Sequence, residues 1–184
     1  SDKSRIREIP RQHANGKAMP GPLRSEEFPM GLPGLQGHDK ERVASSNAAA
    51  EFILGELRLH QSRGGTSGRE NPENSLHWHT PTEIGMSKQG TWWDKLYDAC
   101  SLQGARRKKQ KIRHDVEEIR LWPDMRCRHI HHPQEWTPQE DVDGKTWYPS
   151  KAEAECTACL VFHIVYSVSA WACRVGRAKL AIPR

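Results

Sequence analysis

The sequence predicts an α/β domain with few strands and two well-defined helices. One helix is indicated where Ser45 or Ser46 precedes AAAEFILGELRLHQ, because serine side chains cap helix N-termini and the apolar residues recur with helical spacing. A second helix is indicated from Ser150, which forms a capping box with Glu153 and begins a pattern that runs to Gly176. The segments between these helices have mixed period, so we expect only short strands there.

The two helices are expected to contribute to the core in different ways. In the first helix, Ala49, Phe52, Ile53 and Leu57 lie on one stripe and are the predicted buried face. The second helix is predicted to be an amphipathic C-terminal helix.

Composition suggests two regions within the 184 residues, a length that suits one domain. Residues 1–40 are rich in Pro, Gly and charge, and we expect an extended loop there. Residues 41–184 are the predicted α/β domain. Apolar residues make up only 35% of the chain, so part of this domain should also be loop.

The middle of the chain gives weaker patterns. Thr91 to Leu102 is predicted as a short helix that passes into a strand, and Gly104 to Arg113 as a basic loop or strand. Asp115 to Pro123 favours a short strand or a helical turn. Residues 178–184 fit a last strand.

Charge and cysteine content limit the class of protein. The formal net charge of +5 permits a nucleic-acid partner. An odd number of cysteines, five, without the spacing of a small secreted scaffold indicates reduced thiols in an intracellular protein. No signal peptide is recognised, and the most apolar run, Cys159 to Ala172, is too short to span a bilayer, so no membrane partner is expected.

A dense run of cations is the main indication of a nucleic-acid partner. Six basic side chains fall within eight positions, a density that favours contact with phosphates or a nuclear-import signal. The alternative is a solvated surface loop. The predicted nucleic-acid-binding residues are Arg106, Arg107, Lys108, Lys109, Lys111 and Arg113.

Residue types that bind zinc occur in two places. One is the segment MRCRHIHH, and the other is a CxxC pair inside the predicted C-terminal helix. Structural zinc CxxC pairs usually lie on turns, so buried helix thiols are favoured for this pair and no metal site is predicted. Zinc binding by both groups stays an alternative, and its ligands would come from Cys127, His129, His131, His132, Cys156 and Cys159.

Several short pieces follow one another in a specific order. SRIREIP is followed by PLRSEEFPMGLPGL, a helix with Asn47, the tripeptide ENP, DACSLQGARRKKQ and CRHIHHP. This order resembles the later half of a divergent class of DNA cytosine-5 methyltransferase-like proteins, from about Ser4 to Trp171. ENP and the arginine-rich segment are its specific parts.

The resemblance implies a partial Rossmann-like domain, S-adenosylmethionine as cofactor and DNA as partner. In that family the Glu of the tripeptide holds a cytosine that is flipped from the duplex, and a carboxylic acid at N3 helps the ring accept a thiolate at C6. Glu70 would be that carboxylate, with Asn71 as the second catalytic candidate and Pro72 shaping the loop. Arg107, Lys108 or Lys109 would stand for the family's basic motif.

The chain lacks the family's motifs for the nucleophile and for the cofactor. None of its cysteines follows a proline, SDK occupies the place before SRIREIP where the nucleophile belongs, and no glycine-rich cofactor motif is found. We therefore expect an incomplete, inactive methyltransferase-like domain. The alternatives are a non-catalytic nucleic-acid-binding module of a mobile-element type protein, with or without zinc, and a degenerate reading frame. For ENPENS itself, the alternative is an Asx-type turn that enters a loop.

Overall fold

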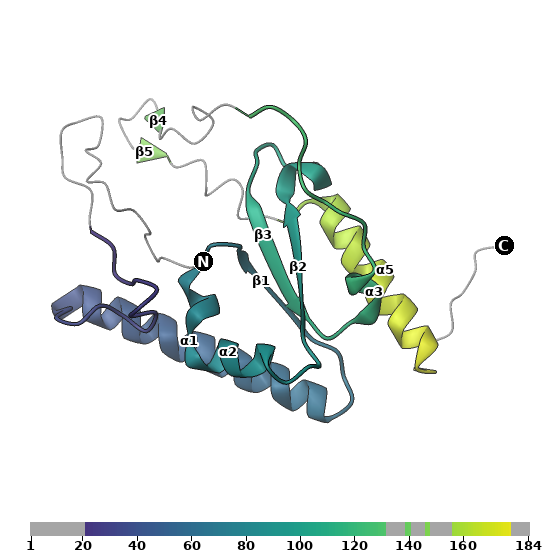
Figure 1. Ribbon diagram of the computed structural model, residues 1–184, viewed down its shortest axis with the longest axis horizontal. Coiled ribbons are helices and arrows are strands. Elements are labelled where there is room, and N and C mark those ends of the chain that lie inside the picture. The colour runs from purple at the N-terminus through teal and green to yellow at the C-terminus, as the bar shows by residue number, and fades with distance from the viewer. Residues whose placement is uncertain (1–20, 132–138, 141–145, 148–155, 178–184) are drawn as a thin grey trace. The chain divides into compact units, whose positions relative to one another are not determined.

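The computed structural model describes residues 21–131, 139–140, 146–147 and 156–177 (Figure 1). The chain divides into two compact units. The first comprises residues 1–65 and 74–92, and the second comprises residues 66–73 and 93–184. The predicted boundary near residue 40 falls within the first helix, α1 (Gly37–Ser62).

The first unit is built on α1, with a 3-10 turn, η1 (Leu76–His79), and a short helix, α2 (Pro81–Ser87). The predicted start of α1 was wrong, because the helix begins at Gly37 after Gln36 and its N-terminus has no side-chain cap. The hydroxyl oxygen of Ser46 instead lies 3.3 Å from Nε2 of His77.

The predicted buried stripe of α1 was also wrong. The helix buries Val43, Ala50 and Leu54, whereas Phe52 is 69% exposed and Ile53 is 45% exposed. Apolar residues lie on several sides of this helix, so its periodicity alone does not select the buried face. Leu54 packs with Met86 and Trp92, and Leu57 joins this cluster at its edge.

The loop before α1 is tied to the helix by polar contacts within the first unit. Arg24 is buried and donates to the Asn47 side-chain oxygen at 2.7 Å, and Asn47 donates to the Met30 carbonyl at 2.7 Å. Part of the predicted extended loop is therefore held in a fixed conformation.

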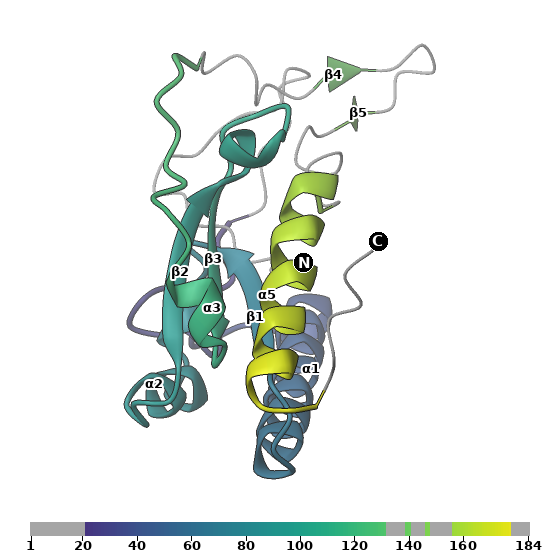
Figure 2. The same ribbon diagram turned by 90° about the vertical axis from the view of Figure 1, so that its right-hand side faces the viewer.

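The second unit contains a three-stranded antiparallel sheet in the order β1-β3-β2. Helices α3 and α5 lie beside each other, as Figure 2 shows. A separate antiparallel pair, β4-β5, consists of two residues in each strand. The elements are β1 (Gly68–Pro72), β2 (Trp93–Asp98), η2 (Ala99–Leu102), β3 (Lys109–His114), α3 (Glu117–Arg120), β4 (Gln139–Glu140), β5 (Thr146–Trp147) and α5 (Ala158–Arg174).

The core of the second unit lies between the sheet and these two helices. Tyr97 and Ile112 come from the sheet, and Leu160 comes from α5. The indole nitrogen of Trp122 donates to the Ser167 hydroxyl at 2.8 Å and so joins the segment after α3 to α5. The other buried members of this core are Leu102, Val116, Ile119, Trp122 and Met125.

The C-terminal helix starts later than its predicted cap within the part of the chain that the structure describes. Thr157 is the N-cap of α5, and its side chain accepts a hydrogen bond from the Leu160 amide. The predicted cap residues Ser150 and Glu153 lie outside the described residues. The exposed face of α5 is itself apolar, since Phe162 is 67% exposed and Val165 is 57% exposed.

The mixed α/β composition is confirmed, while the order of elements in the middle of the chain differs from the prediction. Residues 93–102 form a strand followed by a 3-10 turn, the reverse of the predicted order. The paired strands described here are all antiparallel, so they do not form the parallel sheet of a Rossmann-like domain. No helix in the described part of the chain is long and apolar enough to cross a membrane.

Candidate metal centre and nucleic-acid interface

The predicted basic run is divided between a loop and a strand. Arg106 to Lys108 precede β3 in the loop after η2, and Lys109, Lys111 and Arg113 lie within β3. Side chains alternate along a strand, so Ile112 enters the core while Lys111 and Arg113 project from the other face. The six cations therefore do not form one continuous row.

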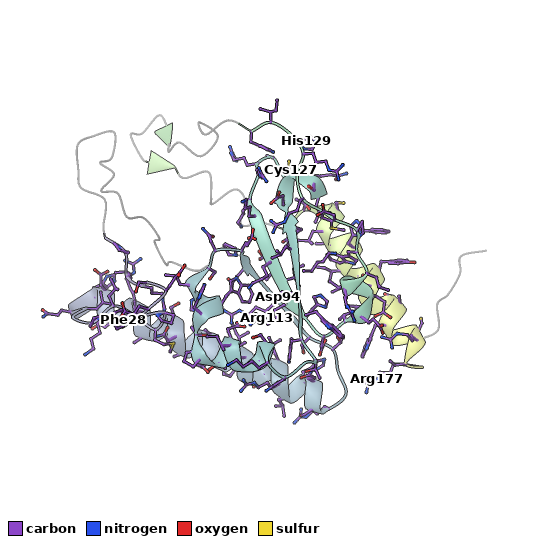
Figure 3. All side chains as sticks on the ribbon, in the orientation of Figure 1. Phe28, Asp94, Arg113, Cys127, His129 and Arg177 are labelled. Atoms are coloured by element: carbon purple, nitrogen blue, oxygen red, sulfur yellow. The ribbon has the colours of Figure 1, made fainter. Side chains whose placement is uncertain are left out.

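Two cations of the run are bound by a single carboxylate, Asp94. Its oxygens accept from Arg113 Nε at 2.7 Å and Nη2 at 2.9 Å, and Lys111 Nζ lies at 3.2 Å (Figure 3). Desolvation raises the pKa of Asp94, but the hydrogen bonds and charges of Arg113 and Lys111 outweigh it and leave the pKa lowered. Because the Arg113 side chain is only 6% exposed, we no longer assign it to phosphate contact.

A second carboxylate, Asp98, joins the basic loop to the Cys/His segment. Asp98 is fully buried at the end of β2 and accepts from Arg107 Nε at 3.2 Å. It also accepts from the Cys127 amide at 2.8 Å and from Arg126 Nη1 at 3.4 Å. Two basic segments that are distant in sequence therefore meet at one end of the sheet.

Arg126 is held from a second direction by Glu73, which follows β1. Its two Nη atoms bind the two carboxylate oxygens of Glu73 at 2.8 and 2.9 Å. The hydrogen bonds from Arg126 outweigh desolvation and lower the pKa of Glu73. The guanidinium thus bridges Glu73 and Asp98 and fixes the backbone before Cys127.

Backbone pairing explains how Cys127 reaches the end of β2. Met125 forms a parallel bridge with Tyr97, and its carbonyl accepts from the Asp98 amide at 3.0 Å. The chain around Met125 therefore runs alongside β2. Cys100, in η2, follows the same end of that strand.

A cluster of four zinc-binding side chains forms at this place, and we call it the Cys/His cluster. Its ligand atoms all lie within 4.8 Å of one another. Cys127 Sγ lies 3.2 Å from His129 Nδ1 and 3.1 Å from His131 Nε2. The members are Cys100, Cys127, His129 and His131.

The two thiols of the Cys/His cluster have different electrostatic surroundings. Desolvation, reinforced by the neighbouring Cys127 sulfur, raises the pKa of Cys100 to about 12. Desolvation also acts on Cys127, but hydrogen bonds from the Cys100 thiol, the His129 amide and the two imidazoles outweigh it and lower the pKa of Cys127 to about 6. Cys127 is thus the thiol favoured as a thiolate near neutral pH.

The predicted base-binding residues lie in β1, not in an Asx-type turn. Glu70 is opposite Ile112 and Asn71 is opposite Lys111 in the pairing with β3. The Glu70 side chain is exposed, yet the chain atoms around it desolvate the carboxyl and raise its pKa against the lowering effect of Lys108. The Asn71 oxygen, in its better amide orientation, accepts from Arg69 at 3.1 Å.

Neither thiol of the CxxC pair belongs to the Cys/His cluster. Cys156 is exposed and lies before α5, so the prediction that both thiols lie inside the helix was wrong for it. Cys159 packs at the edge of the core, as predicted for a buried helix thiol. His132 lies outside the described residues.

The residues of the site that were not predicted from the sequence include Cys100 and Asp98. Cys100 lay in a segment expected to form a helix and a strand, and Asp98 carried no pattern of its own. The only available signal was the pair Asp98 and Cys100 just before the basic run, together with Cys127.

Comparison with known proteins adds no assignment. No family model matches the chain, and no curated protein or solved structure matches it. The resemblance to cytosine-5 methyltransferase-like proteins stays a prediction from the motifs.

Proposed function

We propose that this chain is a non-catalytic nucleic-acid-binding module. The observation that carries the proposal is the anchoring of two basic segments by Asp98, which binds Arg107 and the Cys127 amide. Lys109 and Arg128 are exposed beside these anchored residues. Exposed cations held at one end of a sheet match what phosphate contact requires.

The proposed interface is smaller than the run of six cations. Arg113 and Lys111 are engaged with Asp94, so the contact is expected to involve the loop Arg106–Lys108, Lys109 at the start of β3, and the segment around Arg128. The contact should be independent of base sequence, because contacts with phosphates carry no sequence information.

Salt-dependent binding tests this proposal. Changing Lys109 and Arg128 together to Gln should weaken binding to DNA and RNA of all sequences alike and reduce the salt slope by about 1.5 to 2. The matched control changes two exposed cations of the first unit, Arg58→Gln and Lys88→Gln, with the same loss of charge. Equal binding by both double variants would contradict the proposal.

A second candidate function is a cytosine pocket inherited from a methyltransferase-like domain, within a larger Rossmann-like fold. The raised pKa of Glu70 favours it, because a protonated carboxyl can donate to N3 of cytosine. Glu70→Gln would then reduce any preference for DNA with an unpaired cytosine over DNA with an unpaired thymine. An unchanged preference would count against this function.

Methyl transfer itself is not expected from the chain. In the family that the chain resembles, the thiolate that attacks cytosine comes from a cysteine after proline, and none of the five cysteines has that position. Incubation with labelled S-adenosylmethionine and cytosine-containing DNA should give no incorporation above a control without protein. Incorporation would show that another nucleophile acts.

A further inference from the structure

The Cys/His cluster has the donor set and the spacing of a four-ligand metal site. Two sulfurs and two imidazole nitrogens lie within 4.8 Å of one another. We propose that Cys100, Cys127, His129 and His131 bind one Zn²⁺, which ties the end of β2 to the segment after α3. Four protein ligands close the coordination sphere, so the site is structural.

The distances fit a tetrahedron. With Zn–S near 2.3 Å and Zn–N near 2.0–2.1 Å, a sulfur and a nitrogen on the same ion are separated by about 3.5 Å. The two such distances at Cys127 are 3.2 and 3.1 Å. Entry of the ion therefore requires the donor atoms to move apart by only a few tenths of an ångström.

The donor chemistry selects zinc among common metals. Tetrahedral sites with two sulfurs and two nitrogens favour zinc, whereas magnesium and calcium take oxygen ligands. Two thiolates would neutralise the charge of the ion, so the site adds no net charge beside Arg126 and the exposed Arg128.

Groups around the cluster hold the ligands in place. Asp98 fixes the Cys127 amide, and Arg126 is clamped by Glu73. Cys100 is supported by the turn that Gly104 closes onto the Ala99 carbonyl at 2.8 Å. Such outer contacts orient metal ligands and raise the affinity of a site.

Two other states of the same residues compete with this proposal. Cys100 and Cys127 could form a disulfide, or Cys127 with an imidazole could act as a nucleophilic pair. A nucleophilic pair needs one imidazole and one thiol, and it leaves Cys100 and the second histidine without a role. A disulfide would leave no thiolate for the two imidazoles to contact, so the two histidines would have no role. Zinc uses all four side chains.

Metal analysis of the purified full chain tests the site. After incubation with a zinc salt under reducing conditions and removal of the excess, the parent should retain one zinc per chain with a dissociation constant of about 10⁻⁷ M or tighter. Cys100→Ser and His131→Asn should each weaken zinc binding at least about 100-fold. Cys156→Ser and Cys173→Ser are the matched controls and should bind like the parent. A parent without zinc, or a Cys100→Ser variant that binds like the parent, would overturn the proposal.

A cobalt spectrum tests the same ligands without relying on a serine variant, which could fail to fold. The parent with Co²⁺ should show tetrahedral d–d bands and a sulfur-to-cobalt charge-transfer band. Cys100→His keeps four ligands, so it should keep the d–d bands and lose about half of the charge-transfer intensity, since one of two thiolates remains. A parent spectrum without the sulfur band would also overturn the proposal. No nucleic acid enters these measurements, so their outcome is independent of the proposed function.

Discussion

Asp98 Oδ2 accepts a hydrogen bond from the backbone amide of Cys127 at 2.8 Å, and Arg107 Nε donates to the same carboxylate oxygen at 3.2 Å. One buried carboxylate thus connects the basic loop with the Cys/His cluster. It anchors Arg107 of the proposed nucleic-acid interface and the backbone of the proposed zinc ligand Cys127.

Removal of the Asp98 charge should destabilise the second unit. Asp98→Asn removes the charge that strengthens the hydrogen bonds from Arg107, Arg126 and the Cys127 amide, at an expected cost of about 2 kcal/mol in the free energy of unfolding. Asp39→Asn, which removes an exposed carboxylate paired with Arg42 at 3.5 Å, should cost less than about 0.5 kcal/mol. Urea unfolding measures both variants, and equal effects would refute the role given to Asp98.

The two sides of the Asp94–Arg113 ion pair should respond unequally to mutation. The Arg113 side chain is 6% exposed and the Asp94 side chain is 35% exposed. Asp94→Asn removes the carboxylate charge beside the buried guanidinium of Arg113 and should cost about 3 kcal/mol, whereas Arg113→Gln leaves a carboxylate that water and Lys111 still reach and should cost about 1–2 kcal/mol. The free energies of unfolding of both variants decide this, and the reverse order would contradict the description of the pair.

His114 should make the stability of the second unit depend on pH. Its side chain is fully buried, and burial lowers its pKa from 6.5 to about 4. The unfolded chain therefore binds the proton more tightly, so stability is lost as the pH falls below about 6.5. Between pH 7.5 and 5 the loss should be about 2 kcal/mol.

A variant isolates this contribution from those of other groups. Nδ1 of His114 accepts from the Val116 amide at 3.2 Å, and Asn can offer an acceptor oxygen there without titrating. The difference in unfolding free energy between the parent and His114→Asn should shrink or change sign at low pH. A difference that stays constant from pH 7.5 to 5 would exclude a neutral buried His114.

The turn after β2 should tolerate only glycine at position 104. A Cβ on Gly104 would lie 2.8 Å from the Ala99 carbonyl carbon and oxygen, which are backbone atoms that cannot rotate away. Gly104→Ala should cost about 1–3 kcal/mol and weaken zinc binding through Cys100. Gly55→Ala in α1 meets no atom within 4 Å and should stabilise by about 0.5–1 kcal/mol. Thermal unfolding compares the two, and similar behaviour would contradict the turn geometry.

Local patterns predicted the helices better than the contacts that define the site. The helices around Leu54 and Leu160 were expected because the helical spacing of apolar residues is a pattern of a few neighbouring residues. The buried face of α1 was not predicted, since Phe52 and Ile53 are as apolar as the residues that the core takes. Burial depends on what packs against a helix, and the periodicity of a single segment does not contain that information.

The candidate site was predicted only where its residues are neighbours in sequence. Cys127, His129 and His131 were recognised as neighbours in sequence, while Cys100 is brought to them by the bridge between Tyr97 and Met125. The basic run was found from its density. The sequence did not predict that Arg113 binds Asp94, because this contact follows from the pairing of β2 with β3, in which the two residues lie opposite each other.

X-ray absorption at the zinc edge of the purified, zinc-loaded chain tests the central claim of a Cys/His-bound metal most directly. Two sulfur atoms at about 2.3 Å and two nitrogen atoms at about 2.0–2.1 Å are expected, from Cys100, Cys127, His129 and His131. Zinc bound only by oxygen and nitrogen atoms would contradict this claim. Zinc bound by more than two sulfurs, with Cys156 or Cys159 as a further ligand, would contradict it as well.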